Sequence, residues 1–462
     1  MKRVLAGLLL LGLSAAGVYG YTLNERERSY RQLIADGDAA LARDNTFAAV
    51  EAFSGAITWK PGAMLGYLRR GQTYRRRGEY VAAIRDLRRA SALDPTATQP
   101  LEDLGDAYLA DTPHRYGSAA DRFQEYARLD PRAPRILYKL AFARFHEGKR
   151  PAAIDALQRA LAIDDRVPEA HYLLGLCQRD AQQPELARAA LEHAVRLQPT
   201  FLHAREELAD LYGAMGLTGD RLTQLAFLDA VDPAPSRAVA LGLAYARAGQ
   251  RDRAVTALAA ATERYPDYAY AYVALGRVWL EIAQATGDRV ALRKALGALE
   301  GAVGTDNSSE ALTLFGRALL LTSDAETAER MLLDATKRRP ADPLAFAYLA
   351  DAAERLGHFT VARQALVDYD ALRGDTDARR RSAQAARLAE LSLKVNEPGA
   401  AAAYFLRAAE NGDATFLARA ADAQYRAGDL DAARATVAKA LEKDPANTAA
   451  LAIQRRLPRP KA

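Results

Sequence analysis

The feature of this sequence that most limits how it can fold is a segment of about 34 residues that recurs from residue 30 to residue 445. Each copy ends at a proline or another residue that stops a helix, and most stops lie 33 or 34 residues apart. The stops are Pro61, Pro95, Pro131, Asp165, Pro199, Pro233, Pro266, Asn307, Pro340, Gly374, Asp413 and Pro445. A fixed period of this size indicates a solenoid, in which each repeat buries its apolar face against its neighbours.

Each repeat reads as two helices joined by a turn. In the second repeat, Gly71 and Tyr74 mark the face of a first helix, Gly78 marks the turn, and Ala83 and Leu87 continue at helical spacing. Small residues at positions such as Gly71 allow a neighbouring helix to approach closely. The second helices share an alanine followed four residues later by a larger apolar residue, as at Ala49/Phe53, Ala119/Phe123, Ala187/Leu191, Ala254/Leu258, Ala328/Leu332 and Ala401/Phe405.

This pattern resembles the tetratricopeptide repeat family over about nine tenths of the chain. The resemblance implies an all-α, right-handed superhelical solenoid of about twelve helix-turn-helix repeats, with the first helices lining an inner groove. Half of the residues are apolar and no stretch alternates as a strand would, which agrees with an all-helical chain.

The expected domain organisation follows from the repeats and from one weak joint. Gly213, Gly216 and Gly219 loosen a turn, and two prolines at 233 and 235 favour a boundary after it. Seven extra residues around 276–295 predict a longer helix pair rather than a long loop. The predicted segments are 1–23 (signal-anchor or signal peptide), 24–29 (juxtamembrane linker), 30–233 and 234–445 (two halves of the repeats), and 446–462 (capping helix and tail).

The first 23 residues differ from the repeats. Lys2 and Arg3 precede an uncharged stretch, residues 4–23, which is typical of an export signal. The stretch is just long enough to cross a bilayer and lacks a clean cleavage site, so we expect it to be retained. The repeats would then face the periplasmic side of the cytoplasmic membrane. The alternative is cleavage and secretion to the periplasm.

Composition and motifs exclude several classes of function. A net charge of +5 over 462 residues, without a basic tail, gives no indication of nucleic-acid binding. Cys177 is the only cysteine, and the six histidines are scattered without metal-ligand spacing. No phosphate-binding glycine motif follows a strand. We therefore expect no catalytic residue, no cofactor and no metal, and the chain is not predicted to be an enzyme.

The candidate binding residues lie on the first helices of neighbouring repeats. Tyr138, Phe142 and Phe145 form a second apolar stripe beside the packing stripe of one first helix, and Tyr172 occupies the position equivalent to Tyr138 in the next repeat. Such rings serve either as a partner-binding hot spot or as filler between helices, and the sequence leaves both open.

A polar group of residues in the second repeat completes the predicted partner-binding set. It consists of Arg69, Gln72 and Arg76. The same repeat also contains Arg70, Arg75, Arg77, Arg85, Arg88 and Arg89. These arginines form either a solvated face or a surface that attracts anionic lipid headgroups or an acidic partner.

Together these features predict a non-enzymatic scaffold, anchored in a membrane or exported, that binds unidentified partner proteins through the groove. The alternative function is that of an accessory factor for polysaccharide or outer-envelope export or assembly, a role that proteins resembling this one often have. A catalytic function hidden in the solenoid would need chemistry that the sequence does not suggest.

Overall fold

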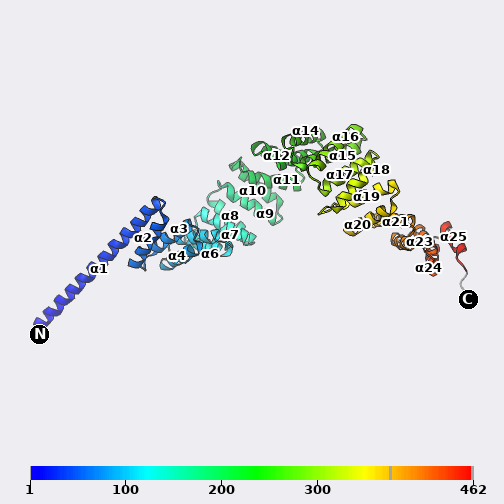
Figure 1. Ribbon diagram of the computed structural model, residues 1–462. Helices are drawn as coiled ribbons and strands as arrows, with labels where there is room; N and C mark the ends of the chain where they lie inside the picture. The colour runs from blue at the N-terminus through cyan, green and yellow to red at the C-terminus, as the bar shows by residue number, and fades with distance from the viewer. Residues whose placement is uncertain (1, 374–376, 411, 459–462) are drawn as a thin grey trace. The chain divides into compact units, whose positions relative to one another are not determined.

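The computed structural model describes residues 2–373, 377–410 and 412–458, with side chains from residue 20 onward. The described residues form 25 helices and no strand (Figure 1). The helices pack in sequential pairs, which confirms the predicted all-α architecture of about twelve repeats.

The chain divides into two compact units, and the division falls within α12. Up to and including that helix, the bounds are α1 Lys2–Ala42, α2 Thr46–Trp59, α3 Met64–Arg76, α4 Tyr80–Leu93, α5 Thr98–Ala110, α6 Tyr116–Leu129, α7 Pro134–His146, α8 Arg150–Ile163, α9 Pro168–Asp180, α10 Pro184–Leu197, α11 Leu202–Ala214 and α12 Thr218–Val231. After it they are α13 Pro235–Arg247, α14 Arg251–Arg264, α15 Ala269–Thr286, α16 Arg289–Thr305, α17 Ser309–Leu321, α18 Ala325–Lys337, α19 Pro343–Leu356, α20 Phe359–Arg373, α21 Ala378–Lys394, α22 Pro398–Ala408, α23 Ala414–Arg426, α24 Leu430–Lys443 and α25 Thr448–Arg456.

The N-terminal unit ends at Gln224 and the C-terminal unit begins at Leu225. This division lies within the region between Gly213 and Pro235, where the sequence loosens a turn and then places two prolines. Each unit has cores of its own, with the largest one of the N-terminal unit running from Leu68 to Ala190.

In seven of the repeats, a glycine of the first helix lies beneath a large apolar side chain of the second helix. At Gly276 in α15, an added Cβ atom would lie 2.5 Å from Cγ of Leu299 in α16, which is closer than two carbon atoms can approach. The same close approach, under 3.0 Å, occurs in the pairs Gly37/Phe53, Gly71/Leu87, Gly105/Phe123, Gly175/Leu191, Gly242/Leu258 and Gly316/Leu332. The apolar partner is fully buried in every pair.

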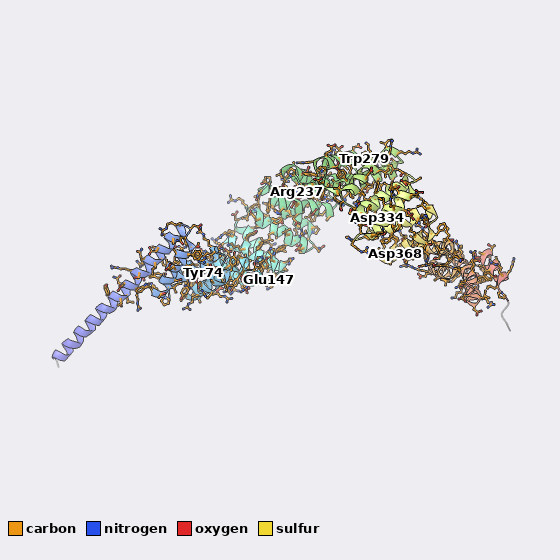
Figure 2. All side chains as sticks on the ribbon, in the orientation of Figure 1. Tyr74, Glu147, Arg237, Trp279, Asp334 and Asp368 are labelled. Carbon is orange, nitrogen blue, oxygen red and sulfur yellow. The ribbon has the colours of Figure 1, made fainter. Side chains whose placement is uncertain are left out.

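The extra residues between 276 and 295 lengthen a helix pair, as the sequence predicts. α15 has 18 residues and α16 has 17, whereas most of their counterparts have 13 or 14. Gly287, in the left-handed conformation, ends α15, and the Asp288 carboxylate caps α16 by accepting a hydrogen bond from the Val290 amide. Across the pair, the Lys294 ammonium lies 4.4 Å from the centroid of the Trp279 ring, which Figure 2 labels.

The predicted signal or anchor segment lies largely outside the part of the chain whose side chains are described, since these begin at residue 20. Within the described residues, no helix combines the length and apolar content that crossing a bilayer requires. Residues 24–29 lie within α1, and the C-terminal half of α1 is the first helix of the first repeat, with Tyr30 and Ile34 buried against Phe53 of α2.

The glycine contacts give a test of the packing within one repeat. We expect Gly276→Ala to lower the free energy of unfolding by about 1–3 kcal/mol, because the new methyl group must displace the buried Leu299 side chain. Gly297→Ala is the matched control in the partner helix α16, where an added Cβ has open space around it. The control should stabilise the chain by up to about 1 kcal/mol through helix propensity. Chemical denaturation measures both, and equal effects of the two changes would contradict the packing.

Candidate partner-binding surface on the first helices

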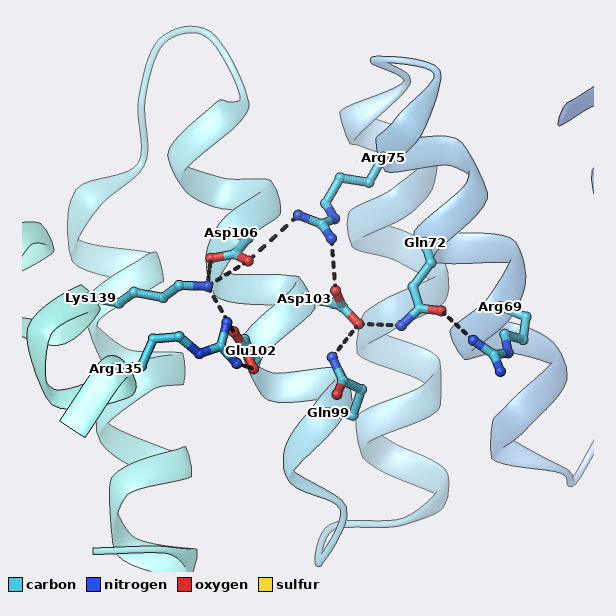
Figure 3. A network of polar contacts seen from close by, with 9 residues as sticks. All are labelled: Arg69, Gln72, Arg75, Gln99, Glu102, Asp103, Asp106, Arg135 and Lys139. Carbon is cyan, nitrogen blue, oxygen red and sulfur yellow. Dashed lines mark hydrogen bonds and ion pairs between the residues drawn. The ribbon is translucent and has the colours of Figure 1, made fainter. Parts of the chain in front are cut away.

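A network of charged and amide side chains joins three successive first helices in the N-terminal unit (Figure 3). Its centre is an acidic group on α5, formed by Glu102, Asp103 and Asp106. The side chains of Glu102 and Asp103 are only 6% and 4% exposed. Carboxylates at this depth require close partners, because removing them from water is costly.

Asp103 is held from α3 and from its own helix. Its Oδ2 atom accepts hydrogen bonds from Nε2 of Gln72 at 2.6 Å and from Nε2 of Gln99 at 3.1 Å. Its Oδ1 atom accepts one from Nη2 of Arg75 at 3.0 Å. Arg69 extends the chain of contacts by donating to Oε1 of Gln72 at 3.3 Å. The carboxylate of Asp103 is thus bonded to three donors from two helices.

Glu102 and Asp106 are held from the other side, by α7. The Lys139 ammonium lies between them, 2.8 Å from Oε1 of Glu102 and 2.7 Å from Oδ1 of Asp106. The Arg135 guanidinium donates to Oε2 of Glu102 at 2.7 Å. Because Glu102 and Asp106 are four residues apart, they share a helix face, and Lys139 between them offsets their repulsion. Arg75 of α3 also approaches Asp106, at 3.5 Å.

The three carboxylates of the network pair with the cations Arg75, Arg135 and Lys139. Its fourth cation, Arg69, pairs with Asp38 of α1. Similar ion pairs join first helices elsewhere within each unit, between residues about one repeat apart. They are Arg69–Asp38 and Arg179–Glu207 in the N-terminal unit, and Arg277–Glu310, Arg387–Asp351 and Arg456–Asp422 in the C-terminal unit. Polar side chains on the first helices therefore bind the next repeat and fix the register of the stack.

The polar residues predicted to bind a partner are engaged within the chain. Gln72 and Arg69 belong to the network, and Arg69 also lies 3.4 Å from Asp38 of α1. Arg76 is separate from the network and pairs with Asp44, in the turn after α1, at 2.7 Å. A partner would have to compete with these contacts to use the three side chains.

The predicted aromatic residues are partly buried on α7 and α9. Tyr138 and Phe142 pack against the large core of the N-terminal unit, as does Phe145. Burial raises the pKa of Tyr138, and the neighbouring Glu169 and Tyr172 add to the rise. The centroid of the Tyr172 ring lies 5.0 Å from that of the Phe201 ring. Burial also raises the pKa of Tyr172. Tyr138 and Tyr172 lie on the successive first helices α7 and α9, which contact each other.

Three side chains in contact with this stripe or with one another, His146, Tyr116 and Arg150, are not among the predicted site residues. His146 is exposed, and its ring centroid lies 4.4 Å from that of Phe142 and 4.8 Å from that of Tyr116, on which it stacks. The Arg150 guanidinium lies 4.9 Å from the centroid of Phe145. The rings packed on His146 remove part of its hydration and thereby lower its pKa, and the positive charge of Arg150 and the nearby His114 contribute. The spacing of His146, four residues after Phe142, is the one sequence signal that could have indicated its place.

Three family models described as tetratricopeptide repeat match this chain, and together they cover more than half of it. One matches residues 113–177, one matches residues 168–201, and one matches residues 239–303, 313–378 and 386–448.

Among curated proteins, the chain is similar to Superkiller complex protein 3 of Mus musculus, with 29% identity over 182 residues, which is 38% of this chain and 11% of that protein. It is also similar to Small glutamine-rich tetratricopeptide repeat-containing protein 2 of Mycosarcoma maydis, with 30% identity over 100 residues, which is 22% of this chain and 28% of that protein. The chain thus spans less than a third of the length of these curated relatives.

Among solved structures, the crystal structure of MamA is 28% identical and covers 33% of this chain and 89% of that one, with a TM-score of 0.32. The crystal structure of YrrB, described as a TPR protein with an unusual peptide-binding site, is 20% identical. It covers 40% of this chain and 94% of that one, with a TM-score of 0.36.

The network predicts that Lys139 contributes to stability through its two carboxylate partners. We expect Lys139→Met to cost about 2 kcal/mol of unfolding free energy, because Glu102 is almost fully buried and loses a charged donor. Lys149→Met is the control, since Lys149 is 57% exposed and pairs with Glu147 at the surface. The control should change stability by about 0.5 kcal/mol or less.

A double-mutant cycle separates the charge contacts from packing of the lysine stem. In a chain that carries Glu102→Gln and Asp106→Asn, Lys139→Met should cost much less than in the wild-type chain. The same cost in both backgrounds would show that the ion pairs do not couple the helices.

Proposed function

Because the chain belongs to the tetratricopeptide repeat family, we propose that it is a non-enzymatic scaffold that binds a partner protein along α7 and α9 of its N-terminal unit. Repeats of this family imply protein partners. The contact surface that we propose consists of Tyr138, Phe142 and Tyr172, with Phe145 and His146 at its edge.

The observation that carries this proposal is the contrast between the rings and the network beside them. The charges of the network are neutralised by one another, so they hold the helices in place and are not free to recognise a ligand. The rings of Tyr138, Phe142 and Tyr172 retain exposed surface. Partly exposed aromatic rings on a rigid support are favoured as anchors of protein interfaces, because they bury a large area at a small entropic cost.

We further propose that the N-terminal segment holds the scaffold at a cytoplasmic membrane, with the repeats on the periplasmic side. The support is the uncharged stretch at residues 4–23, which follows Lys2 and Arg3. The intact mass of the protein isolated from its native membranes tests the retention of this segment. A mass equal to that of the full sequence is expected, and a mature chain that starts near Gly17 or Tyr21 would instead indicate export after cleavage.

The binding surface is tested by comparing two substitutions on α7. We expect Phe142→Ser to weaken the capture of partner proteins from native membranes while it lowers the melting temperature only modestly, since the ring is partly exposed. Leu140→Ser is the core control, because Leu140 is 2% exposed and its loss should cost about 3 kcal/mol or more.

The two substitutions distinguish a partner-binding stripe from one that only fills the space between helices. If Phe142→Ser lowers the melting temperature as much as Leu140→Ser does, the aromatic stripe is interhelical filler. If Phe142→Ser leaves both stability and the set of captured proteins unchanged, the partner binds elsewhere.

A further inference from the structure

The outer face of α4 carries positive charge without an exposed carboxylate of its own. The exposed residues of this second helix include Val81, Arg85, Arg88 and Arg89. The one acidic residue of α4, Asp86, is turned inward and is 2% exposed. Its two oxygens accept hydrogen bonds from the Arg70 guanidinium of α3 at 2.6 and 3.1 Å. The outward side of α4 therefore presents three guanidinium groups.

The remaining arginines of this repeat are already neutralised. Arg75 pairs with Asp103 at 3.0 Å, Arg76 pairs with Asp44 at 2.7 Å, and Arg77 pairs with Glu79 at 2.6 Å. On α4, Arg85 has only a 3.5 Å approach to the buried Asp86. Within the described residues, Arg88 and Arg89 have no carboxylate partner. The arginines of this repeat thus form two groups. Those on α3 and in the turn after it are paired with carboxylates, whereas those on the outer side of α4 are not neutralised.

A cavity of about 330 Å³ adjoins this face, between α4, α5 and α6. Its lining consists of Arg88, Leu104, Tyr108, Ser118, Asp121 and Arg122. Arg88 is held in place because its Nε donates a hydrogen bond to the Tyr108 hydroxyl at 2.8 Å.

The acidic groups near the cavity are already paired with cations. Asp121, the one carboxylate in the lining, accepts a hydrogen bond from Arg144 at 3.2 Å, and Arg122 donates to Glu125 at 2.6 Å. Since Arg88 belongs both to the exposed face and to the cavity, the two form one continuous positively charged surface.

We propose that this surface, which we call the α4 arginine face (Arg85, Arg88, Arg89 and the adjoining cavity), docks an acidic segment of a partner protein. A carboxylate of that segment enters the cavity against Arg88, where the Ser118 hydroxyl can also donate to it. Neighbouring acidic residues meet Arg85 and Arg89, which lie one helical turn apart. The complementarity of charge identifies the segment as acidic, and bidentate contacts favour arginine over lysine for this purpose.

The occupant is a protein segment rather than a bilayer surface. A helix that lies on a membrane needs an apolar face beside its cations, and the one exposed large apolar residue of α4 is Val81. A recessed cavity also suits a single side chain better than a flat surface. Because the α4 arginine face lies on a second helix, it is distinct from the aromatic stripe of α7 and α9. The scaffold would thus bind two partners at once.

The test uses the full-length chain and a fluorescein-labelled oligoglutamate peptide, with an oligoglutamine peptide as the uncharged comparison. Fluorescence anisotropy should show that the oligoglutamate peptide binds and that the oligoglutamine peptide does not. The triple change Arg85→Gln, Arg88→Gln and Arg89→Gln should weaken this binding at least about tenfold. Higher salt should weaken it as well.

The matched control removes the same charge from second helices of the C-terminal unit, by the triple change Arg253→Gln, Arg293→Gln and Arg330→Gln. All six arginines are exposed, so both triple variants should melt as the wild type does. The control should bind the peptide as the wild type does. Equal weakening in the two triple variants would show unspecific attraction to net charge and overturn the proposal.

Two further results would also overturn it. The first is the absence of oligoglutamate binding by the wild-type chain. The second is binding to phosphatidylglycerol vesicles that is lost in the α4 triple variant while peptide binding is not, since this would assign the face to a membrane.

A single substitution tests the cavity itself. Ser118→Ala should weaken peptide binding while it leaves the arginines of the α4 arginine face in place.

Discussion

The close approach of the two helices within a repeat is the contact on which the rest of this structure depends. A glycine such as Gly105 on a first helix lies directly under a fully buried side chain, here Phe123, on the second helix. At these glycines an added methyl group would overlap the larger side chain, so the helix pair has one depth and one register. Other repeats have a buried alanine at the same spacing, as at Ala141 and Leu157. The paired helices then present a fixed surface to the next repeat, and stability accumulates from one neighbour to the next.

The fixed spacing of the repeats explains where polar side chains can be buried. Since α3, α5 and α7 are held at defined separations, Gln72, Asp103 and Lys139 reach partners about one repeat away and complete a network in which every carboxylate has a cationic partner. Two surfaces of the N-terminal unit lie outside this network and are our candidates for binding. One is the partly exposed aromatic stripe on the first helices α7 and α9, and the other is the unneutralised arginine face of the second helix α4. In our proposal, the first surface holds an apolar segment of one protein and the second an acidic segment of another.

The sequence predicts the fold well because the signals that determine it lie within single repeats. The spacing of Pro95 and Pro131, the glycines under large side chains and the extra residues before Ala295 all act within one repeat, so the number of helices and the long pair α15 and α16 could be anticipated. The charged contacts could not, because they join side chains 28 to 37 residues apart whose rotamers depend on packing. Eight arginines in one repeat look alike in the sequence, and only the structure shows that Arg70 turns inward to Asp86 while Arg88 faces outward.

The measurement that tests this account most directly is hydrogen exchange of the full-length chain carrying Gly276→Ala. If the glycine contact fixes one helix pair and passes its effect only to neighbours, amide protection should fall in α15 and α16 and, to a smaller extent, in the adjoining repeats from α13 to α18. The helices of the N-terminal unit should keep the protection of the wild-type chain. A uniform loss of protection along the whole chain, or no loss in α15 and α16, would contradict the claim that this contact holds its helix pair together.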